Sequence, residues 1–123
     1  MNLPGMKVSK TEYTVYILTN FNKTVLYTGV TNCIEQRLIE HYLEKDDPLS
    51  NAFTAKYKAF YLVYFETYQY INDDIAREKE IKKWRREKKD KLIDTTNPER
   101  EFLNKQLLGE WPPQNMSHRK DEQ

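Results

Sequence analysis

The first clear pattern in the chain is a pair of short runs in which β-branched and aromatic residues outnumber polar ones. The runs are Tyr13–Thr19 and Thr24–Val30, and each has the composition of a β-strand. The four residues between them, Asn-Phe-Asn-Lys at 20–23, favour a turn. The pattern therefore predicts a β-hairpin.

The register of this hairpin decides which side chains meet. A symmetric closure pairs Thr19 with Thr24, and residue numbers across an antiparallel pair sum to a constant. The same register places Tyr16 directly opposite Tyr27. We therefore expect the two tyrosines to be neighbours on one face of the sheet, close to the point at which the second strand ends.

A helix is predicted directly after the hairpin, over residues 33 to about 45. Asn32 suits the N-cap, and Glu35 at the third helical position would complete a capping box. The Asp-Asp-Pro run at 46–48 favours the end of the helix. The apolar stripe of this helix consists of Ile34, Leu38 and Tyr42.

The second half of the chain predicts one more strand and two more helices. Residues 60–68 are apolar on both faces, which favours a strand at a central, well-covered position. Residues 75–89 form a helical pattern that starts after 72–74, and Asn97 with Pro98 favours the start of a last helix. The expected packing residues of these helices are Ile75, Ile81, Trp84, Phe102, Leu103 and Leu107.

These elements predict the fold class and the domain. The order is β-β-α-β-α-α, an α+β fold in which a small three-stranded antiparallel sheet is flanked by helices. The 123 residues suffice for one compact domain, which we place at 11–111, with flexible termini at 1–10 and 112–123.

Composition indicates a cytoplasmic protein. No apolar run approaches the roughly 20 residues that span a bilayer, so no membrane association is expected. The first ten residues lack the apolar segment of a secretory signal. A single cysteine, Cys33, cannot form an internal disulfide, which fits a reducing compartment.

Charge is unevenly distributed although the net charge is only +1. Residues 77–91 hold nine Lys or Arg and four Asp or Glu, a local net charge of +5. A concentrated basic segment is a weak electrostatic footprint for a polyanion. A solvated helix face with salt bridges explains the same pattern.

Five side chains suggest chemistry, and each also has a structural explanation. Tyr16 and Tyr27 are two of nine tyrosines, so either is explained as a half-buried strand aromatic. Arg37 and His41 lie four residues apart and share a helix face, as surface Arg-His pairs often do. Glu78 lies on or beside an apolar helix stripe, where partial burial relieved by an ion pair with Lys82, four residues later, is the structural explanation.

Together the five side chains suit hydrolysis of a phosphodiester. That reaction needs a nucleophile, a base that activates it, and positive charge on the phosphate oxygens. Tyrosines can orient water, although a phenol with a pKa near 10 needs help to act as a base. Arg37 can hold a phosphate with its planar fork, His41 can share proton transfer, and Glu78 can bind Mg²⁺.

The same residues carry a resemblance to a known family. The chain resembles the GIY-YIG nuclease superfamily, and more closely the small stand-alone bacterial proteins related to the N-terminal domain of the C component of excinuclease ABC. The resemblance runs from about Tyr13 to Trp111. The motifs that carry it are VYILTN, LYTGVTN, QRLIEH, KYKAFYLVYFE, AREKEIKKWRREKK and NPERE.

The resemblance implies a role for the hairpin residues. Tyr16 matches the proposed general base of the family, and Tyr27 matches the tyrosine that contacts the water or the phosphate. Gly29 matches the glycine that lets the strand end close to the substrate. The glycine that opens the first motif is Thr14 here, and Thr28 replaces a bulky aliphatic residue.

The resemblance also implies roles for four residues on the later elements. Arg37 matches the arginine that contacts the scissile phosphate, and His41 matches a histidine found in part of the superfamily. Glu78 matches the glutamate that binds a single Mg²⁺ or Mn²⁺ ion. Asn97 matches an asparagine with a structural or phosphate-binding role.

The function that we expect is a metal-dependent endonuclease that acts on branched or damaged DNA, in repair or processing. The low net charge predicts weak DNA binding of its own, with affinity supplied by a protein partner. The expected nucleic-acid contacts are Gly29, Lys82, Arg85, Arg86, Lys88 and Asn97.

Two alternatives remain. The chain could be a non-catalytic nucleic-acid-binding or adaptor module, for which binding would depend on the basic residues and not on Glu78. It could also be a protein-interaction domain that uses Trp84 and Trp111 as anchors.

Overall fold

The computed structural model describes residues 12–113, so the predicted flexible segment 1–10 and nearly all of 112–123 lie outside the described residues. The fold is α+β, as predicted, with a three-stranded antiparallel sheet. In chain order the elements are β1 (Tyr13–Thr19), β2 (Leu26–Thr31), α1 (Ile34–Glu44), α2 (Phe53–Lys56), β3 (Tyr61–Tyr68), α3 (Ile71–Lys82), α4 (Arg86–Asp94) and α5 (Asn104–Leu108).

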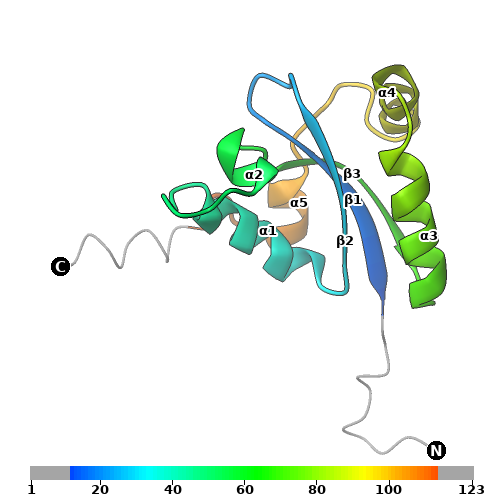
Figure 1. Ribbon diagram of the computed structural model, residues 1–123, viewed down its shortest axis with the longest axis horizontal. Helices are drawn as coiled ribbons and strands as arrows, with labels where there is room; N and C mark the ends of the chain where they lie inside the picture. The colour runs from blue at the N-terminus through cyan, green and yellow to red at the C-terminus, as the bar shows by residue number, and fades with distance from the viewer. Residues whose placement is uncertain (1–11, 114–123) are drawn as a thin grey trace, which may run out of the picture.

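Helices cover both faces of the sheet, as Figure 1 shows: α1, α2 and α5 lie on one side, and α3 and α4 on the other. Alternating residues of β1 therefore enter two separate cores. Tyr16 and Leu18 pack with Leu38 of α1, whereas Val15 and Ile17 pack with residues of α3 and α4. Within residues 12–113, no helix is both long enough and apolar enough to cross a bilayer.

The central strand is β1, because the sheet order is β2-β1-β3. The prediction that residues 60–68 form the central strand is therefore wrong. That strand is covered on both faces by helices, and the C-terminal segment protects its outer edge. Asn104 accepts a hydrogen bond from Leu62 N–H at 2.7 Å and donates one to Phe60 C=O at 2.9 Å. The apolar character of β3 thus reflects a covered edge.

The register of the hairpin differs from the symmetric one by two residues. Tyr16 pairs with Gly29 and Leu18 with Tyr27, so the direct pairing of the two tyrosines was wrong. The cause is Asn20, whose side-chain oxygen accepts the backbone N–H groups of residues 24 and 25 at 2.8 and 3.3 Å. These bonds keep 24 and 25 in the loop. Because the shift is an even number of residues, both tyrosines still face α1.

Helix α1 begins one residue later than predicted. Its N-cap is Cys33, which makes no side-chain capping bond, so the predicted capping box at Asn32 and Glu35 does not form. Thr31 accepts the Cys33 N–H at 3.1 Å instead. The predicted range of the helix is otherwise confirmed, and it positions Arg37 and His41.

The predicted helix 75–89 is two helices, α3 and α4, separated by a break at residues 83–85. The inward face of α3 carries Asp74, Glu78 and Ile81, whereas Ile75 is 37% exposed and is not an anchor. The break lets α4 turn back so that Ile93 reaches the core beside β1. The last helix, α5, begins at Asn104, so Asn97 does not start it.

Candidate active site

Tyr16 and Gly29 are cross-strand partners in unusually close contact. The Tyr16 side chain is 2% exposed, and its ring lies over the backbone of Gly29. A Cβ atom at position 29 would lie 2.5 Å from both Tyr16 Cζ and Tyr16 Oη. Any other residue at 29 would therefore displace the phenol, which explains why this strand carries a glycine.

Tyr27 lies diagonally across the hairpin from Tyr16, on the same face of the sheet. The two ring centroids are 6.4 Å apart and the rings are tilted by 45°. Tyr27 is only partly buried, whereas Tyr16 is enclosed. The pair thus presents one phenol near the surface and one beneath it.

His41 connects Tyr16 to a third side chain. Its Nε2 lies 3.0 Å from Tyr16 Oη, and its Nδ1 lies 3.2 Å from the hydroxyl of Thr54 on α2. All three side chains are buried. Burial and the nearby positive charge of Arg37 lower the pKa of His41 below its ordinary value of 6.5, so the imidazole is neutral at neutral pH.

The charges around Tyr16 come from both sides of the sheet. Burial raises the pKa of Tyr16 well above its ordinary value, and the charges of Tyr27, Glu40 and Glu78 raise it further, whereas Arg37 lowers it. Arg37 on α1 and Glu78 on α3 thus both shift the pKa of Tyr16, although the two helices lie on opposite sides of the sheet. An isolated Tyr16 would remain protonated at neutral pH.

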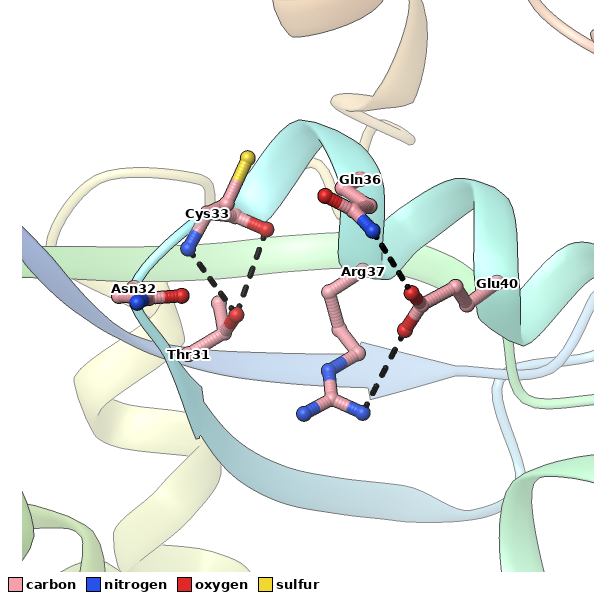
Figure 2. Close-up of a pocket in the computed structure, with 6 residues that line it drawn as sticks. All are labelled: Thr31, Asn32, Cys33, Gln36, Arg37 and Glu40. Atoms are coloured by element: carbon pink, nitrogen blue, oxygen red, sulfur yellow. Dashed lines mark hydrogen bonds and ion pairs between the residues drawn. The ribbon is translucent and has the colours of Figure 1, made fainter.

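Arg37 lies at the mouth of a small hollow beside the start of α1. Its side chain is 42% exposed and makes a loose ion pair with Glu40 at 3.6 Å. Figure 2 shows its guanidinium extending into the hollow, whose volume is about 120 Å³. The hollow is lined by Thr31, Asn32, Cys33, Gln36, Arg37 and Glu40. An exposed guanidinium with one weak partner is available to an anionic ligand.

Glu78 is 9% exposed and projects from α3 toward the sheet. One carboxylate oxygen lies 2.6 Å from the ammonium of Lys82, which is half exposed and one turn further along the helix. Among residues 12–113, no three His, Cys, Asp or Glu side chains gather into a metal-binding group. A divalent ion at Glu78 would therefore have one carboxylate, water and phosphate oxygens as ligands, a set that suits Mg²⁺.

Asp74 lies one turn before Glu78 on the same helix face. It is fully buried, and neither of its carboxylate oxygens has a hydrogen-bond partner within the described part of the chain. Burial raises the pKa of Asp74 to about 6, and the negative charges of Glu78 and Glu66 add to the effect. The inward face of α3 therefore carries excess negative charge, which favours a bound cation.

The predicted basic contacts on α3 and α4 have different surroundings. Lys82 pairs with Glu78, and Arg86 pairs with Asp90 and donates to backbone carbonyls of the β1–β2 loop. Arg85 and Lys88 line a second hollow of about 450 Å³, where the Lys88 ammonium lies 4.5 Å from the Trp84 ring centroid.

Asn97 is 6% exposed and is hydrogen-bonded to β3 and to the loop before α5. Its amide nitrogen donates to Val63 C=O at 3.0 Å and to Glu101 C=O at 2.9 Å, and its oxygen accepts the Glu101 N–H. Both amide hydrogens are used inside the protein, which favours the structural role.

Two residues beside the tyrosines were not anticipated as site residues, and both lie on the four-residue helix α2. Thr54 bonds to His41, and Phe53 stacks on Tyr27 with ring centroids 6.1 Å apart. No spacing rule links position 54 to position 41. The only available signal was a pair of aromatic residues, Phe53 and Tyr57, in a short linker.

The GIY-YIG catalytic domain family matches residues 12–91, about two thirds of the chain. The chain belongs to the GIY-YIG family. The matched segment includes the hairpin, α1 and Glu78. No curated protein matches the sequence.

Among solved structures, the chain is similar to the UPF0213 protein BH0048 from Bacillus halodurans, determined by NMR in solution. The sequences are 24% identical, the TM-score is 0.47, and the alignment covers 76% of this chain and 95% of that one.

Proposed function

We propose that this GIY-YIG domain is a metal-dependent endonuclease that hydrolyses phosphodiester bonds in DNA, with Tyr16, Tyr27, Arg37, His41 and Glu78 as its catalytic residues. The observation that carries the proposal is the buried hydrogen bond between Tyr16 and His41, at 3.0 Å, within reach of the charges of Arg37 and Glu78. Structural packing alone does not require a neutral imidazole on a buried phenol.

His41 can act as the proton acceptor that Tyr16 needs in order to work as a base. Since burial opposes the phenolate, Tyr16 cannot remove a proton from water unless its own proton leaves at the same time. The neutral His41 can accept that proton at Nε2, provided that Nδ1 carries its hydrogen and donates it to Thr54. Thr54 is then a positioning residue that selects the reactive tautomer.

Arg37 and Tyr27 would contact the substrate. The exposed guanidinium of Arg37 can bind two oxygens of the scissile phosphate and offset their charge. The partly exposed Tyr27 would donate a hydrogen bond to the phosphate or to the attacking water. Both side chains lie on the α1 side of the sheet.

Glu78 would hold the metal ion, which we propose to be a single Mg²⁺ or Mn²⁺. A bound divalent ion neutralises charge that develops on the phosphate and lowers the pKa of coordinated water. The carboxylate of Glu78 fits this role because it is shielded from bulk water and, among residues 12–113, is paired only with the half-exposed Lys82. The unpaired Asp74 adds negative charge that favours the cation.

The DNA affinity of the domain alone should be modest. Of the four proposed basic contacts, Lys82 and Arg86 are engaged in ion pairs, which leaves Arg85 and Lys88 beside Trp84. We therefore propose that a protein partner supplies further DNA affinity in DNA repair or processing.

The experiment that tests this proposal is a cleavage panel with Mg²⁺, Mn²⁺ and EDTA on duplex, flapped and branched DNA. We expect metal-dependent nicking by the wild type and its loss in Glu78→Gln, whose circular dichroism should match the wild type. If Glu78→Gln cleaves at the wild-type rate, the metal assignment is wrong. Cleavage that persists in EDTA would show contamination by another nuclease or a different chemistry.

A non-catalytic nucleic-acid-binding module is the second candidate, favoured by the hollow that combines Trp84 with Arg85 and Lys88. In that case Arg85→Gln with Lys88→Gln would abolish salt-dependent DNA binding, whereas Glu78→Gln would leave DNA binding unchanged. Because the endonuclease proposal requires cleavage to depend on Glu78, the same panel separates the two.

A further inference from the structure

A row of aromatic rings leads from the buried Tyr16 out to the surface of α2. Tyr27 stacks on Phe53 with centroids 6.1 Å apart and planes 24° from parallel. Phe53 in turn contacts Tyr57 at 4.7 Å. Phe53 and Tyr57 are 41% and 42% exposed. The row therefore connects the candidate active site to an aromatic surface that water reaches.

The core does not require these two rings. The buried residues of α2 are Thr54 and Ala55, and they hold the helix against the rest of the domain. Phe53, the first residue of the helix, and Tyr57, its C-cap, are both exposed instead. Large aromatic side chains that remain half exposed beside a site are typical of contact surfaces.

Positive charge accompanies the rings. The ammonium of Lys56 lies 5.4 Å from the Tyr57 ring centroid, and within residues 12–113 it forms no salt bridge. An aromatic pair with an unpaired cation matches the way in which proteins bind single-stranded nucleic acid: bases stack on the rings and the cation meets the backbone.

We infer that Phe53 and Tyr57 form a platform on which an unpaired base stacks next to the scissile phosphate. This inference rests on the proposed nuclease function and deepens it by naming the two side chains that would hold an unpaired nucleotide at the cut. In an intact duplex each base is covered by its neighbours on both faces, so it cannot offer a face to Phe53. Continuity with Tyr27 places the platform directly beside the proposed phosphate position.

The test measures stacking without cleavage. The probe is a short DNA duplex with a single-stranded flap that carries 2-aminopurine at the nucleotide next to the junction, in EDTA. The fluorescence of 2-aminopurine falls when it stacks on an aromatic ring. We expect quenching by the wild type, and a roughly 5- to 150-fold weaker affinity for Phe53→Leu and for Tyr57→Leu.

The matched control is Tyr70→Leu. Tyr70 is 68% exposed and lies at the start of α3, on the other side of the sheet, so the same substitution removes an exposed ring away from α2. We expect Tyr70→Leu to bind the flap as the wild type does. The wild type and the three leucine variants should all bind a fully paired duplex of the same length with equal affinity.

The outcomes separate this inference from the proposed function. If the wild type cleaves DNA but Phe53→Leu and Tyr57→Leu keep the wild-type flap affinity and flap preference, the platform is wrong and the nuclease stands. If the leucine variants lose flap binding but no metal supports cleavage, the platform stands and the nuclease fails. If they change only the self-association of the chain in sedimentation, the rings form a protein contact and the inference is overturned.

Discussion

The ring of Tyr16 occupies the space in which a side chain at position 29 would begin, since a Cβ atom at 29 would lie only 2.5 Å from Tyr16 Oη. The two residues pair directly across the hairpin. A glycine is therefore required at position 29 to leave space for the phenol of Tyr16 on the neighbouring strand, whether or not a substrate also approaches this position. One backbone position thereby fixes where the Tyr16 hydroxyl meets His41.

Replacing Gly29 by alanine should damage the site more than the fold. We expect Gly29→Ala to cost about 1–3 kcal/mol in the free energy of unfolding, because the added methyl group overpacks a buried ring. Nicking should fall by at least tenfold, since the ring must move away from His41. Urea denaturation and single-turnover nicking measure the two effects.

The matched control is Gly109→Ala. Gly109 has a φ of 79°, but a Cβ there meets no atom within 4 Å. This substitution should cost about 1 kcal/mol through backbone strain and leave nicking unchanged. Equal loss of activity in both variants would show that Gly29 acts through stability alone.

The fold was largely predictable because its strands and first helix have strong local patterns. The α+β class, the three strands and the range of α1 follow from runs such as Tyr13–Thr19, whereas the short helix α2 between α1 and β3 was not in the predicted order. The hairpin register did not follow, because it depends on hydrogen bonds made by the Asn20 side chain. The edge position of β3 could not be predicted for a related reason. Asn104, more than 40 residues later in the chain, forms hydrogen bonds with backbone groups at the edge of this strand.

The sequence indicated which side chains to consider as a candidate site, but it did not indicate the contacts between them. The position of Glu78 beside an apolar stripe correctly indicated an inward-facing carboxylate. The break between α3 and α4 was missed because residues 75–89 contain no glycine or proline, and tertiary packing of Ile93 imposes it. The bond from His41 to Thr54 joins two elements that no sequence periodicity relates.

The ion pair between Lys82 and Glu78 should compete with metal binding. We expect Lys82→Met to lower the Mg²⁺ concentration for half-maximal nicking severalfold, because the carboxylate loses its 2.6 Å partner. Since the Lys82 ammonium is half exposed and water can replace it at the carboxylate, stability should change by only about 1 kcal/mol. A Mg²⁺ titration of nicking provides the measurement.

Lys79→Met is the control for this titration, because Lys79 is exposed on the same helix and carries the same charge. It should leave the half-maximal concentration within twofold of the wild type. An unchanged or higher requirement for Mg²⁺ in Lys82→Met would argue against Glu78 as the metal ligand.

The buried carboxylate of Asp74 should make stability depend on pH. Its pKa is about 6 in the folded protein and has an ordinary value of 3.8. The folded state therefore binds the proton more tightly, so the free energy of unfolding should fall as pH rises from about 4 to about 6 and then level off. The total loss from this group is on the order of 3 kcal/mol.

Asp74→Asn isolates this contribution. The variant should match the wild type near pH 4 and be more stable at pH 7, as urea denaturation across the pH range would show. A constant difference between the two proteins at all pH values would mean that Asp74 does not titrate in this window.

The amide of Asn104 should be essential to the edge of β3. We expect Asn104→Ala to cost about 2–4 kcal/mol, because it leaves Leu62 N–H and Phe60 C=O buried without partners. Asn72→Ala, at an exposed position of α3, should cost less than about 1 kcal/mol. Thermal or urea denaturation compares them, and similar values would show that water replaces the lost bonds.

The most direct test of the central claim is a double-mutant cycle of Tyr16→Phe and His41→Gln, read by single-turnover nicking of branched DNA with Mg²⁺. If the two side chains act as one proton-transfer unit, each single variant should lose roughly 10²–10⁴-fold in rate, and the double variant should be no slower than the slower single one. The account would be contradicted if the rate loss of the double variant equalled the product of the two single losses. Cleavage at the wild-type rate by either single variant would also contradict it.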